Sequence, residues 1–575
     1  MTRTAILGGK RETADWNPSH DSSGESGSDP VGDLLRELRV EQQSLSAVEQ
    51  FAQDHAAEPS QARYYARLLP AAPPGPGQQY AFEVDLDRCS GCKSCVVACH
   101  ELNGLDESET WRDVGLLVGG SSHSPVWQHV TTACHHCIEP ACLAACPVNA
   151  YDKDPLTGIV RHWDDQCFGC QYCVLACPYD VPKYNAARGI VRKCDLCAGR
   201  LAQHEAPACV QACPHEAIAI RVVDMTQVVE NAEVGSFLPA APESHLTLPT
   251  TVFKTERVLP RNTLPADYYA LSPQPPHWPL IVMLVLTQLS VGAFCVGTWL
   301  AWQSPLSVDP AFLLLHATAA TAWGLLALGA SLLHLGRPQF AYRAVLGLGH
   351  SWLSREILAF GLFAGAAVLY TAAVWSGLLQ PVALRTFEAV VAGAGVAAVF
   401  CSIMIYVFTR REFWNFERTG SRFLLTGLLL GISAVWLTIA LLKLVQQGTR
   451  LEGGRDWGGA ELAPALMATV GIKLVLELAQ LRHHADPRNS PMNRSARLLT
   501  GLLSNAFLAR MGCGLFGGLV LPMFIIQSLS TTGSQALPVE VLMALSFVAC
   551  LAGEILERYL FFAAVAAPRM PGSIR

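Results

Sequence analysis

The sequence predicts a chain of two halves: a cysteine-dense α+β half, followed by an all-α half that crosses a membrane eight times. Three observations predict this class. Of the 575 residues, 51% are hydrophobic and only 15% are charged, whereas soluble domains carry about 25% charged residues. Sixteen of the 20 cysteines lie between Cys89 and Cys213, and the long apolar runs all lie after Trp278. The net charge of -6 leaves no basic footprint for nucleic acid, which is excluded as a partner.

Shifts in composition divide the chain into four segments. Residues 1–79 are rich in Ser, Gly, Pro, Asp and Glu, and we expect them to form a largely disordered arm. Residues 80–220 contain the sixteen clustered cysteines. Residues 221–278 hold eight prolines and are predicted to be an extended connector with one strand-like stretch at residues 250–255, and residues 279–575 are predicted to be the membrane anchor.

The predicted arm has room for one amphipathic helix, which is either a surface helix without a partner or a docking helix. Its apolar residues follow Asp29 and Pro30 at roughly helical spacing and are Leu34, Leu35, Leu38 and Val40. We expect neither a secretory nor a twin-arginine signal, because Lys10 and Arg11 are followed by polar residues rather than by an apolar run. Export would therefore need the signal of a partner.

The apolar half contains eight runs that are each long enough to cross a bilayer, which takes about 20 residues. The runs are residues 279–301, 310–334, 354–377, 383–407, 422–446, 463–482, 511–531 and 537–562. Eleven arginines lie around the loops after the second, fourth and sixth runs, against three in the opposite loops. Short loops rich in positive charge stay in the cytoplasm. We therefore expect a multi-pass protein of the inner (plasma) membrane whose N-terminal half faces the cytoplasm.

The sixteen clustered cysteines form four quartets with spacing typical of iron–sulfur ligands. The first and third quartets read C-x2-C-x2-C-x3-C, the second C-x2-C-x4-C-x3-C and the fourth C-x2-C-x11-C-x3-C. A [4Fe-4S] cluster takes four thiolates, and in the bacterial ferredoxin run the fourth Cys ligates the other cluster. Such crossing holds two clusters close together, as electron hopping requires, so the pattern predicts a double ferredoxin-like domain. The predicted ligands are Cys89, Cys92, Cys95, Cys99, Cys134, Cys137, Cys142, Cys146, Cys167, Cys170, Cys173, Cys177, Cys194, Cys197, Cys209 and Cys213.

Structural zinc and disulfides are the alternatives for these cysteines. Structural zinc favours isolated tetrahedral sets such as two separated C-x2-C pairs, and disulfides suit a much shorter, secreted chain. Neither a structural zinc site nor a disulfide requires a third Cys and a trailing Cys-Pro that recur in successive quartets. Pro147, Pro178 and Pro214 follow the last Cys of the second, third and fourth quartets, whereas His100 takes this place in the first. The repetition favours iron–sulfur clusters.

The cysteine region, over roughly residues 80–220, resembles the iron–sulfur (B) subunits of the dimethyl sulfoxide reductase family of complex iron–sulfur molybdoenzymes. The resemblance implies four [4Fe-4S] clusters, because Cys170 is present where some relatives carry Trp and a [3Fe-4S] centre. It also implies four ligand sets that mix the quartets. They are set 1 (Cys89, Cys92, Cys95 and Cys213), set 2 (Cys99, Cys194, Cys197 and Cys209), set 3 (Cys134, Cys137, Cys142 and Cys177) and set 4 (Cys146, Cys167, Cys170 and Cys173).

The apolar half resembles the membrane anchor (C) subunit of the same family, fused here to the iron–sulfur half. The motifs that carry this resemblance are HWPL at residues 277–280, LHLGRP at 333–338, LSREI at 353–357 and AGEI at 552–555. In that family the positions matching His334 and Glu356 belong to the quinol site. The resemblance therefore implies a quinone, either menaquinone or ubiquinone, as a further cofactor.

Ionisable groups at membrane depth lead to the same site, because their burial is expensive and marks functional candidates. Alternating topology places five of them near the face that carries the iron–sulfur half: His334, Glu356, Tyr406, Glu554 and Arg558. Quinone chemistry moves two protons with two electrons, so it needs an acid or base near each carbonyl. Structural readings remain open: a helix-end cap for His334, a first-turn carboxylate for Glu356 and inward ion pairs for Glu554 with Arg558 and for Lys473 with Glu477.

No haem is expected in the anchor. The only histidines within the predicted spans, His316 and His334, lie 18 residues and about 27 Å apart on one helix, so they cannot ligate one iron. The four remaining cysteines are expected to be apolar packing residues and are Cys295, Cys401, Cys513 and Cys550.

These expectations combine into one functional hypothesis. The chain is predicted to be a non-catalytic electron-transfer and membrane-anchor subunit, which relays electrons between the quinone pool and a separate molybdopterin catalytic subunit. The family implies menaquinol oxidation coupled to reduction of a sulfoxide, or the reverse flow in a sulfite-oxidising relative. Two alternatives stay open: a quinone-linked subunit of a hydrogenase or another dehydrogenase, and a zinc-stapled membrane scaffold.

Overall fold

The computed structural model describes residues 30–43, 46, 49, 61–235, 237–303, 309–445, 459–486, 490–530 and 538–572. The chain divides into two compact units, Met1–Arg63 and Tyr64–Arg575. In the first unit, helix α1 (Pro30–Gln43) contains the four residues of the predicted amphipathic helix, all of them exposed. Most of the predicted arm lies outside the described residues. Its end is packed, however, since Tyr65 and Leu68 in α3 (Ala62–Tyr65) and η1 (Ala66–Leu68) are buried.

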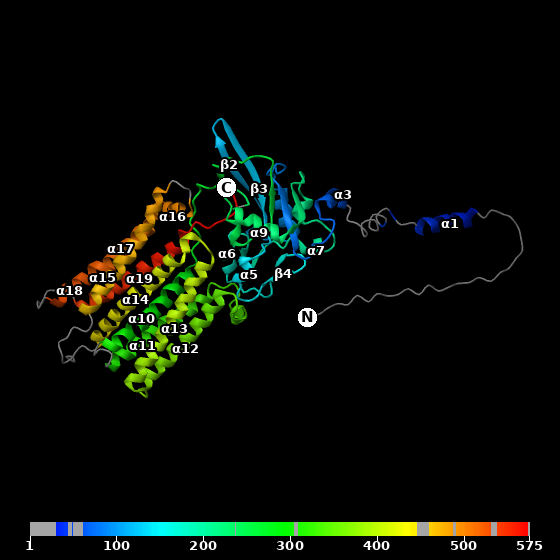
Figure 1. The fold of residues 1–575 in the computed structure, drawn as a ribbon. Coiled ribbons are helices and arrows are strands. Elements are labelled where there is room, and N and C mark those ends of the chain that lie inside the picture. Colours follow the sequence, from blue (N-terminus) through cyan, green and yellow to red (C-terminus); the bar gives the residue numbers. More distant parts are fainter. Residues whose placement is uncertain are drawn as a thin grey trace, which may run out of the picture. The chain divides into compact units, whose positions relative to one another are not determined.

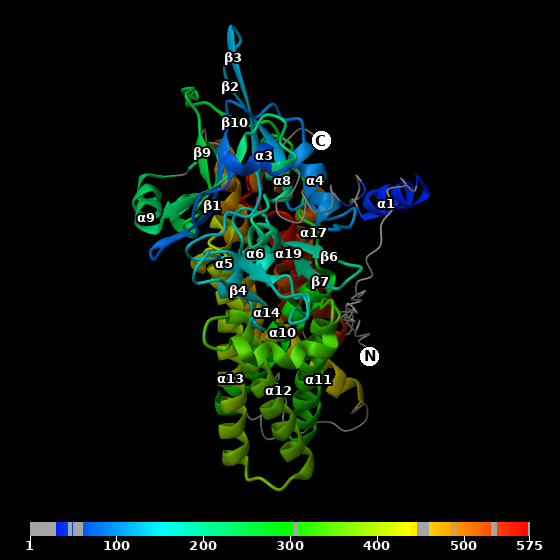
Figure 2. The same ribbon diagram turned by 90° about the vertical axis from the view of Figure 1, so that its right-hand side faces the viewer.

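The cysteine region folds into an α+β domain that is closed by its own two ends. Strand β1 (Gln78–Asp85) pairs antiparallel with β8 (Ile218–Asp224) and parallel with β9 (Val252–Lys254), giving the order β8-β1-β9. The strands β2 (Asp113–Ser121) and β3 (Ser124–Thr132) form a long hairpin that projects from the domain in Figure 2. The short strand β10 (Leu264–Pro265) pairs with β2.

One short helix follows the first cysteines of each quartet, and two small hairpins follow the middle quartets. The helices are α4 (Ser94–Leu102), α5 (Ala141–Ala145), α6 (Tyr172–Ala176) and α8 (Ala208–Gln211), with α7 (Ala198–Leu201) before the last. The hairpins pair β4 (Tyr151–Lys153) with β5 (Val160–His162), and β6 (Lys183–Asn185) with β7 (Ile190–Arg192). This repeated helix and hairpin arrangement confirms the predicted double ferredoxin-like fold.

The connector is more structured than its proline content predicts. It contains helix α9 (Met225–Val234), whose cap Asp224 accepts hydrogen bonds from the backbone N–H groups of Thr226 and Gln227. It also contains η2 (Ser244–Leu246) and contributes β9 and β10 to two different sheets. Strand β9 lies within the stretch 250–255 that was predicted to be strand-like, whereas helix α9 was not predicted in the connector.

Within the described residues, the anchor has eight helices that are long and apolar enough to span a membrane, as predicted. They are α10 (Trp278–Gln303), α11 (Pro310–Leu332), α12 (Trp352–Ser376), α13 (Pro381–Phe408), α14 (Phe416–Val445), α15 (Gly459–Leu478), the pair α17 (Ser504–Leu515) and α18 (Leu521–Ser530), and α19 (Val539–Ala563). A π-helical turn, η7 (Phe516–Val520), joins α17 to α18, so the seventh span begins seven residues before its predicted start at 511.

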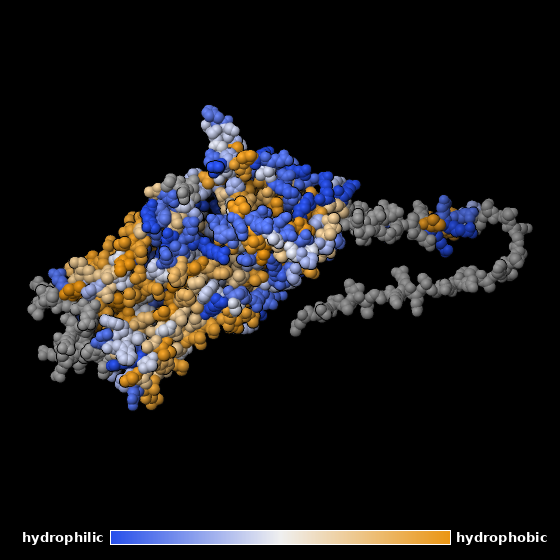
Figure 3. Space-filling view, viewed as in Figure 1, coloured by the Kyte–Doolittle hydropathy of each residue, from blue (hydrophilic) through white to orange (hydrophobic). Residues whose placement is uncertain are grey.

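Hydropathy separates the two parts of the second unit. In Figure 3 hydrophobic surface extends over the long helices, which lie side by side in Figure 1, and hydrophilic surface gathers over the cysteine-rich domain. Shorter elements follow the spans on the side of that domain. They are η4 (Pro338–Gly347), η5 (Glu412–Trp414), η6 (Ala479–Ala485) and the amphipathic helix α16 (Pro491–Thr500).

Helix α10 occupies the centre of the anchor and packs against α11, α13, α14 and α19. Its closest approach is to α14, where a Cβ added to Gly292 would lie only 1.8 Å from the carbonyl oxygen of Gly427. A side chain at this position would have to push two backbones apart. The two central helices therefore depend on glycine for their contact.

We predict that Gly292→Ala destabilises the anchor by about 1–3 kcal/mol, the usual cost of overpacking a filled interior. The matched control is Gly365→Ala, since a Cβ added to Gly365 meets no atom within 4 Å. Thermal unfolding of the detergent-solubilised chain, followed by tryptophan fluorescence, measures the difference. Equal melting temperatures for the two variants would contradict the proposed close contact.

Candidate functional site

The outer quartets of cysteines mix their members. Burial raises the pKa of the Cys89 thiol, and the nearby sulfurs of Cys95 and Cys213 raise it further. Burial likewise raises the pKa of Cys99 to about 12, and the sulfur of Cys209 adds to this rise. Cys213 from the fourth quartet therefore lies beside the first, whereas Cys99 from the first lies beside the fourth.

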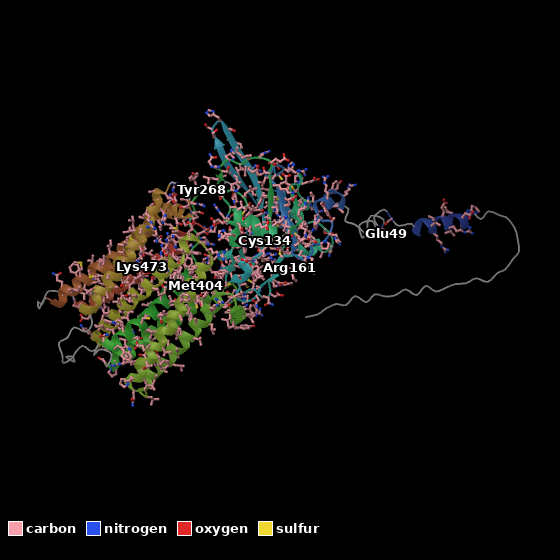
Figure 4. All side chains as sticks on the ribbon, in the orientation of Figure 1. Glu49, Cys134, Arg161, Tyr268, Met404 and Lys473 are labelled. Carbon is pink, nitrogen blue, oxygen red and sulfur yellow. The ribbon has the colours of Figure 1, made fainter. Side chains whose placement is uncertain are left out.

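The middle quartets exchange a member in the same way. Burial raises the pKa of Cys142, and the nearby sulfurs of Cys177 and Cys134 raise it further. Burial also raises the pKa of Cys173, with a contribution from the sulfur of Cys146. The structure thus brings the sixteen cysteines together in the four sets that the family resemblance implies. Figure 4 marks Cys134, a member of set 3, in the cysteine-rich domain.

Two buried cations lie between the sets. Arg112 is 2% exposed, and although burial lowers its pKa, the sulfurs of sets 1 and 2 raise the pKa by more. One of its terminal nitrogens donates to the Thr131 hydroxyl at 3.1 Å, and its guanidinium also lies beside the sulfur of Cys209. Lys193 is 3% exposed and lies between sets 2 and 3, with its Nζ 3.6 Å from the sulfur of Cys134. Both cations fit anionic groups at the sets.

The geometry of the sets fits clusters better than single ions or disulfides. All 20 cysteines are free. Across the described ranges, no three His, Cys, Asp or Glu side chains converge closely enough to hold one metal ion, whereas a four-iron cube holds its four sulfur ligands farther apart. Backbone N–H groups also point at ligand sulfurs, from Ala150 to Cys146 at 3.2 Å and from Ala217 to Cys213 at 3.3 Å. Such bonds favour thiolate character.

The four sets follow one another from the surface to the anchor. Set 1 includes the exposed Cys92. Arg112 is an electrostatic neighbour of sets 1 and 2, and Lys193 of sets 2 and 3. The buried Tyr151 is a neighbour of sets 3 and 4, through the sulfurs of Cys142 and Cys173. The order is therefore set 1, set 2, set 3 and set 4.

Set 4 lies directly against the anchor, through helix α6. Tyr172, between two cysteines of set 4, donates a hydrogen bond from its hydroxyl to the carbonyl of Ile405 at 3.1 Å. Burial raises the pKa of Tyr172, and Glu356 and Tyr406 raise it further. Glu356 is 4% exposed and accepts a short hydrogen bond from the Ser402 hydroxyl. Two of the five candidate residues therefore sit beside set 4.

The loop before α12 also docks on set 4. The Ser351 hydroxyl donates to the carbonyl of Ala145 at 2.7 Å, and Nε2 of His350 lies 2.9 Å from the carbonyl of Cys146. Moreover, Ala145 and Tyr172 belong to the same buried apolar core as the helices of the anchor. The iron–sulfur half and the anchor thus share a packed interface at set 4.

His334 makes its hydrogen bond to its own helix end and not to Glu356 or Tyr406. The helix ends at Leu332, two residues before the predicted end, and Nδ1 of His334 makes a short hydrogen bond to the carbonyl of Ser331, as a helix-end cap does. Burial lowers the pKa of His334 to about 4, so its ring is neutral at pH 7. Its electrostatic neighbour is His277, which lines a cavity of about 330 Å³ at the junction of the two halves. None of the five candidates lines this cavity.

Glu554 and Arg558 are not the partners of each other, so the predicted ion pair was wrong. Glu554 pairs with Lys473 through a short contact and with Arg510 at 2.9 Å. Arg558 pairs with Glu557 at 3.5 Å. All five side chains are at most 2% exposed. The partners of Glu554 come from facing helices, because these side chains point into the bundle, where Figure 4 labels Lys473, whereas Arg558 pairs with the adjacent residue of α19.

The predicted pair of Lys473 with Glu477 was wrong for the same reason. Glu477 accepts two hydrogen bonds from Arg510, at 2.9 and 3.1 Å, from the neighbouring helix α17. Arg422 of α14 pairs with Glu557 at 3.5 Å. Four cations and three carboxylates thus form one buried network across α14, α15, α17 and α19.

Sequence reasoning missed several buried polar residues. Tyr172 was missed because the flanking cysteines gave a much stronger signal than a single tyrosine does. Glu388 of α13 is 2% exposed and hydrogen-bonds with Tyr370. Its Oε1 and the Nε2 of His316 both lie within 3 Å of the position of a Cβ on Gly297. The signal for Glu388 was present, since an acid within a long apolar run is unusual.

Comparison with known proteins agrees with both halves. Residues 125–223 match the 4Fe-4S dicluster domain, and residues 274–564, just over half of the chain, match the DMSO reductase anchor subunit (DmsC) family. These matches confirm the resemblance seen in the sequence and the predicted order of an iron–sulfur domain followed by a membrane domain.

Three curated relatives match the iron–sulfur half. The probable anaerobic dimethyl sulfoxide reductase subunit YnfG of Escherichia coli K12 is 35% identical over 187 residues, 31% of this protein and 88% of YnfG. The B subunit of the anaerobic dimethyl sulfoxide reductase of Haemophilus influenzae is 32% identical over 189 residues, 31% of this protein and 91% of the relative. The hydrogenase-2 operon protein HybA of Escherichia coli O157:H7 is 35% identical over 172 residues, 25% of this protein and 52% of HybA.

The family match covers the anchor, and the relatives cover the electron-carrying half that precedes it. The eight spans make this a multi-pass membrane protein. The protein belongs to the DMSO reductase anchor subunit (DmsC) family and joins that anchor to an electron-transferring iron–sulfur half, similar to the B subunit of anaerobic dimethyl sulfoxide reductase, in one polypeptide.

Proposed function

We propose that the chain relays electrons between a membrane quinone and a separate molybdopterin catalytic subunit. The observation that carries this proposal is the contact at Tyr172, which joins set 4 to the buried Glu356 and Tyr406 of the anchor. An acid and a hydroxyl beneath the last set of thiols are the groups that quinone chemistry needs there. The proposal also rests on the relatives, two of which are named as subunits of dimethyl sulfoxide reductase.

In this proposal, sets 1 to 4 each hold one [4Fe-4S] cluster, which supplies one-electron transfer when bound. The backbone N–H groups of Ala150 and Ala217 stabilise thiolates by hydrogen bonding. Arg112 and Lys193 offset the negative charge of neighbouring sets from buried positions. Charge and hydrogen bonds of this kind set the reduction potentials of such clusters.

We predict that Arg112→Met lowers the reduction potentials of the two outer clusters. Removing a buried positive charge disfavours the more negative, reduced state by on the order of 1–2 kcal/mol at an effective dielectric constant of about 20. An EPR-monitored redox titration measures the shift. The control is Arg221→Met, which removes a half-exposed cation that pairs with Glu83. Equal potentials in both variants would refute the role given to Arg112.

For the quinone, menaquinone or ubiquinone, we propose that Glu356 exchanges a proton with it. The Ser402 hydroxyl orients the carboxyl, and burial removes competing water. Tyr406 sits among Trp414, Phe423 and Phe561, which fix its ring edge-on. Glu356 and Tyr406 lie at the end of the cluster series. Glu356 would therefore accept a proton from a bound quinol beside the thiols of the set that would receive its electron.

We predict that Glu356→Gln slows quinol-driven reduction of the clusters at least about 100-fold, the usual contribution of a positioned acid or base. Stopped-flow absorbance with a soluble quinol measures the rate, and the EPR spectrum of the dithionite-reduced protein should stay unchanged. Glu388→Gln is the matched control, because Glu388 is also a buried acid of the bundle. An unchanged rate in Glu356→Gln, or an equal loss in Glu388→Gln, would exclude this role for Glu356.

His334 is proposed as the second group near the quinone, as a neutral hydrogen-bonding partner. Since its pKa is lowered to about 4, we predict that the quinol-driven rate shows no histidine titration between about pH 6 and pH 8. Replacing His334 by Ala should slow that rate roughly tenfold, the loss of about one hydrogen bond to the reacting molecule. A rate that is unaffected in His334→Ala would leave His334 as a helix cap only.

Glu554 and Arg558 receive a different role from the one that the sequence indicated. Their charges are committed to Lys473, Arg510 and Glu557, so we propose that they hold α19 against α14 and α15. Arg558 also lies 4.0 Å from the ring centroid of Phe423, a neighbour of Tyr406. In this proposal, Glu554 and Arg558 therefore position Tyr406 and do not contact the quinone.

The partner is proposed to dock near set 1, where Cys92 reaches the surface. We also propose an inner-membrane location with the iron–sulfur half on the cytoplasmic side, as the arginine-rich loops favour.

A hydrogenase is the second candidate partner, favoured by the similarity to HybA, a hydrogenase-2 operon protein. Affinity purification of the tagged full chain from its host membranes separates the two: a molybdenum-containing large subunit supports the proposal, and a nickel-iron subunit contradicts it.

A further inference from the structure

The junction of the two halves contains a cavity of about 330 Å³ that is lined by Cys177 of set 3 but by none of the five quinone-site candidates. Helix α6 forms one wall, and the others come from the segment before α10, the loop after α13, helix α16 and the segment after α19. These elements meet where the membrane-spanning helices begin and end, at Trp278 for α10 and Ala563 for α19. The cavity therefore lies at the level of the membrane surface.

Two of the arginines in this cavity have nitrogen atoms without partners. Arg411 is 8% exposed, and one of its terminal nitrogens donates to the carbonyl of Leu175 at 2.9 Å. Its Nε is buried and has no hydrogen-bond partner in the described part of the chain, and the same holds for the Nε of Arg494. Burial lowers the pKa of Arg411 to about 10, so the group remains charged at pH 7.

Arg411 has Asp180 as an electrostatic neighbour and Arg494 has Asp267, but each of these acids also pairs with another cation. Arg569 also lines the cavity but pairs with Asp267 through a short contact. Asp180, the acidic residue of the wall, pairs with Lys183 at 2.7 Å. The site therefore keeps a positive charge that calls for an anion with several acceptor oxygens.

Part of the remaining wall is apolar and accessible, and this part includes Val174, Leu271, Ala567 and Pro568. We propose that the cavity binds the phosphate of an anionic phospholipid, with the acyl chains along this apolar wall. Arginine forks bind phosphate in two places at once, and basic pockets beside membrane helices bind anionic headgroups. A quinone carries no charge and would leave both guanidinium groups unmatched, and free phosphate would leave the apolar wall uncovered.

Bound there, the lipid would touch α6 and the ends of α10 and α19, and so would hold the iron–sulfur half to the anchor beside set 4. Arg411 ties the site to that half, since it donates to Leu175 of α6. This inference does not depend on which partner or quinone the chain uses.

Native mass spectrometry of the delipidated full chain in detergent tests the site. The probes are dioleoyl phosphatidylglycerol, dioleoyl phosphatidylcholine and inorganic phosphate. We expect one phosphatidylglycerol to bind roughly tenfold more tightly than phosphatidylcholine, and Arg411→Gln to weaken its binding roughly tenfold, as the loss of a charge-assisted hydrogen bond does. The matched control Arg410→Gln, an exposed arginine that donates instead to Leu246, should change binding less than about twofold.

Arg494→Gln serves as a second variant if Arg411→Gln disturbs folding. The guanidinium carbon of Arg494 lies 4.9 Å from the ring centroid of Tyr268, so this arginine does not stack on the iron–sulfur half. Iron content and visible absorbance report correct folding of every variant. Equal binding of the two lipids, or equal binding by wild type and both cavity variants, would overturn the proposal. Inorganic phosphate that binds as tightly as phosphatidylglycerol and displaces it would overturn the lipid as the source and leave a phosphate site.

Discussion

The gathering of sixteen thiols within one small α+β domain, most of them buried or half-buried, is the constraint on which the rest of this molecule depends. Burial raises the pKa of most of them, as for Cys99, Cys142 and Cys173, so the domain interior does not favour free thiolates. Metal clusters supply the compensating charge, and Arg112 and Lys193 add to it from the gaps between sets. The short helices and hairpins pack these sulfurs together with buried apolar side chains such as Phe168, Ile190 and Val191. We infer that the fold and the electron path depend on the same groups.

A second constraint is the fixed position of set 4 against the membrane helices. Ala145, Tyr172 and Ala176 belong to the core of the anchor. Backbone also meets backbone, because a Cβ on Gly336 would lie 2.1 Å from the carbonyl oxygen of Gly189, which itself has a positive φ of 66°. Electron transfer needs short and constant distances, and glycine at this contact allows the two halves to approach. The connector, which adds strands to two sheets, serves the same purpose.

The fold class could be predicted from the sequence because it follows from local spacing: cysteine quartets indicate iron–sulfur clusters, and runs of about 20 apolar residues indicate the spans. The cluster sets mix distant quartets, so they were implied by the family resemblance and not by the spacing. Partners across the bundle could not be predicted in this way. Glu554 and Lys473 lie 81 residues apart, and only the packing of α15 against α19 brings them together. Tyr172 and Ser402 were missed because their roles arise from contacts between the halves.

The arginine-rich loops illustrate how one sequence signal has two physical causes. The sequence favoured a cytoplasmic side because of these arginines. However, Arg337 and Arg343 donate to the carbonyls of Asp164 and Asp165 at 3.0 and 2.9 Å. Their positions therefore also serve the docking of the iron–sulfur half, so part of the charge bias has a structural origin.

The central claim is a series of four clusters that starts near Cys92 and ends beside Glu356. Iron and acid-labile sulfide analysis of the anaerobically purified full chain, together with EPR of the reduced protein, tests it most directly. We expect about sixteen irons and about sixteen sulfides per chain, and low-temperature EPR signals that show magnetic interaction between neighbouring clusters. Stoichiometric zinc, or far fewer irons in material that has not been exposed to oxygen, would contradict it.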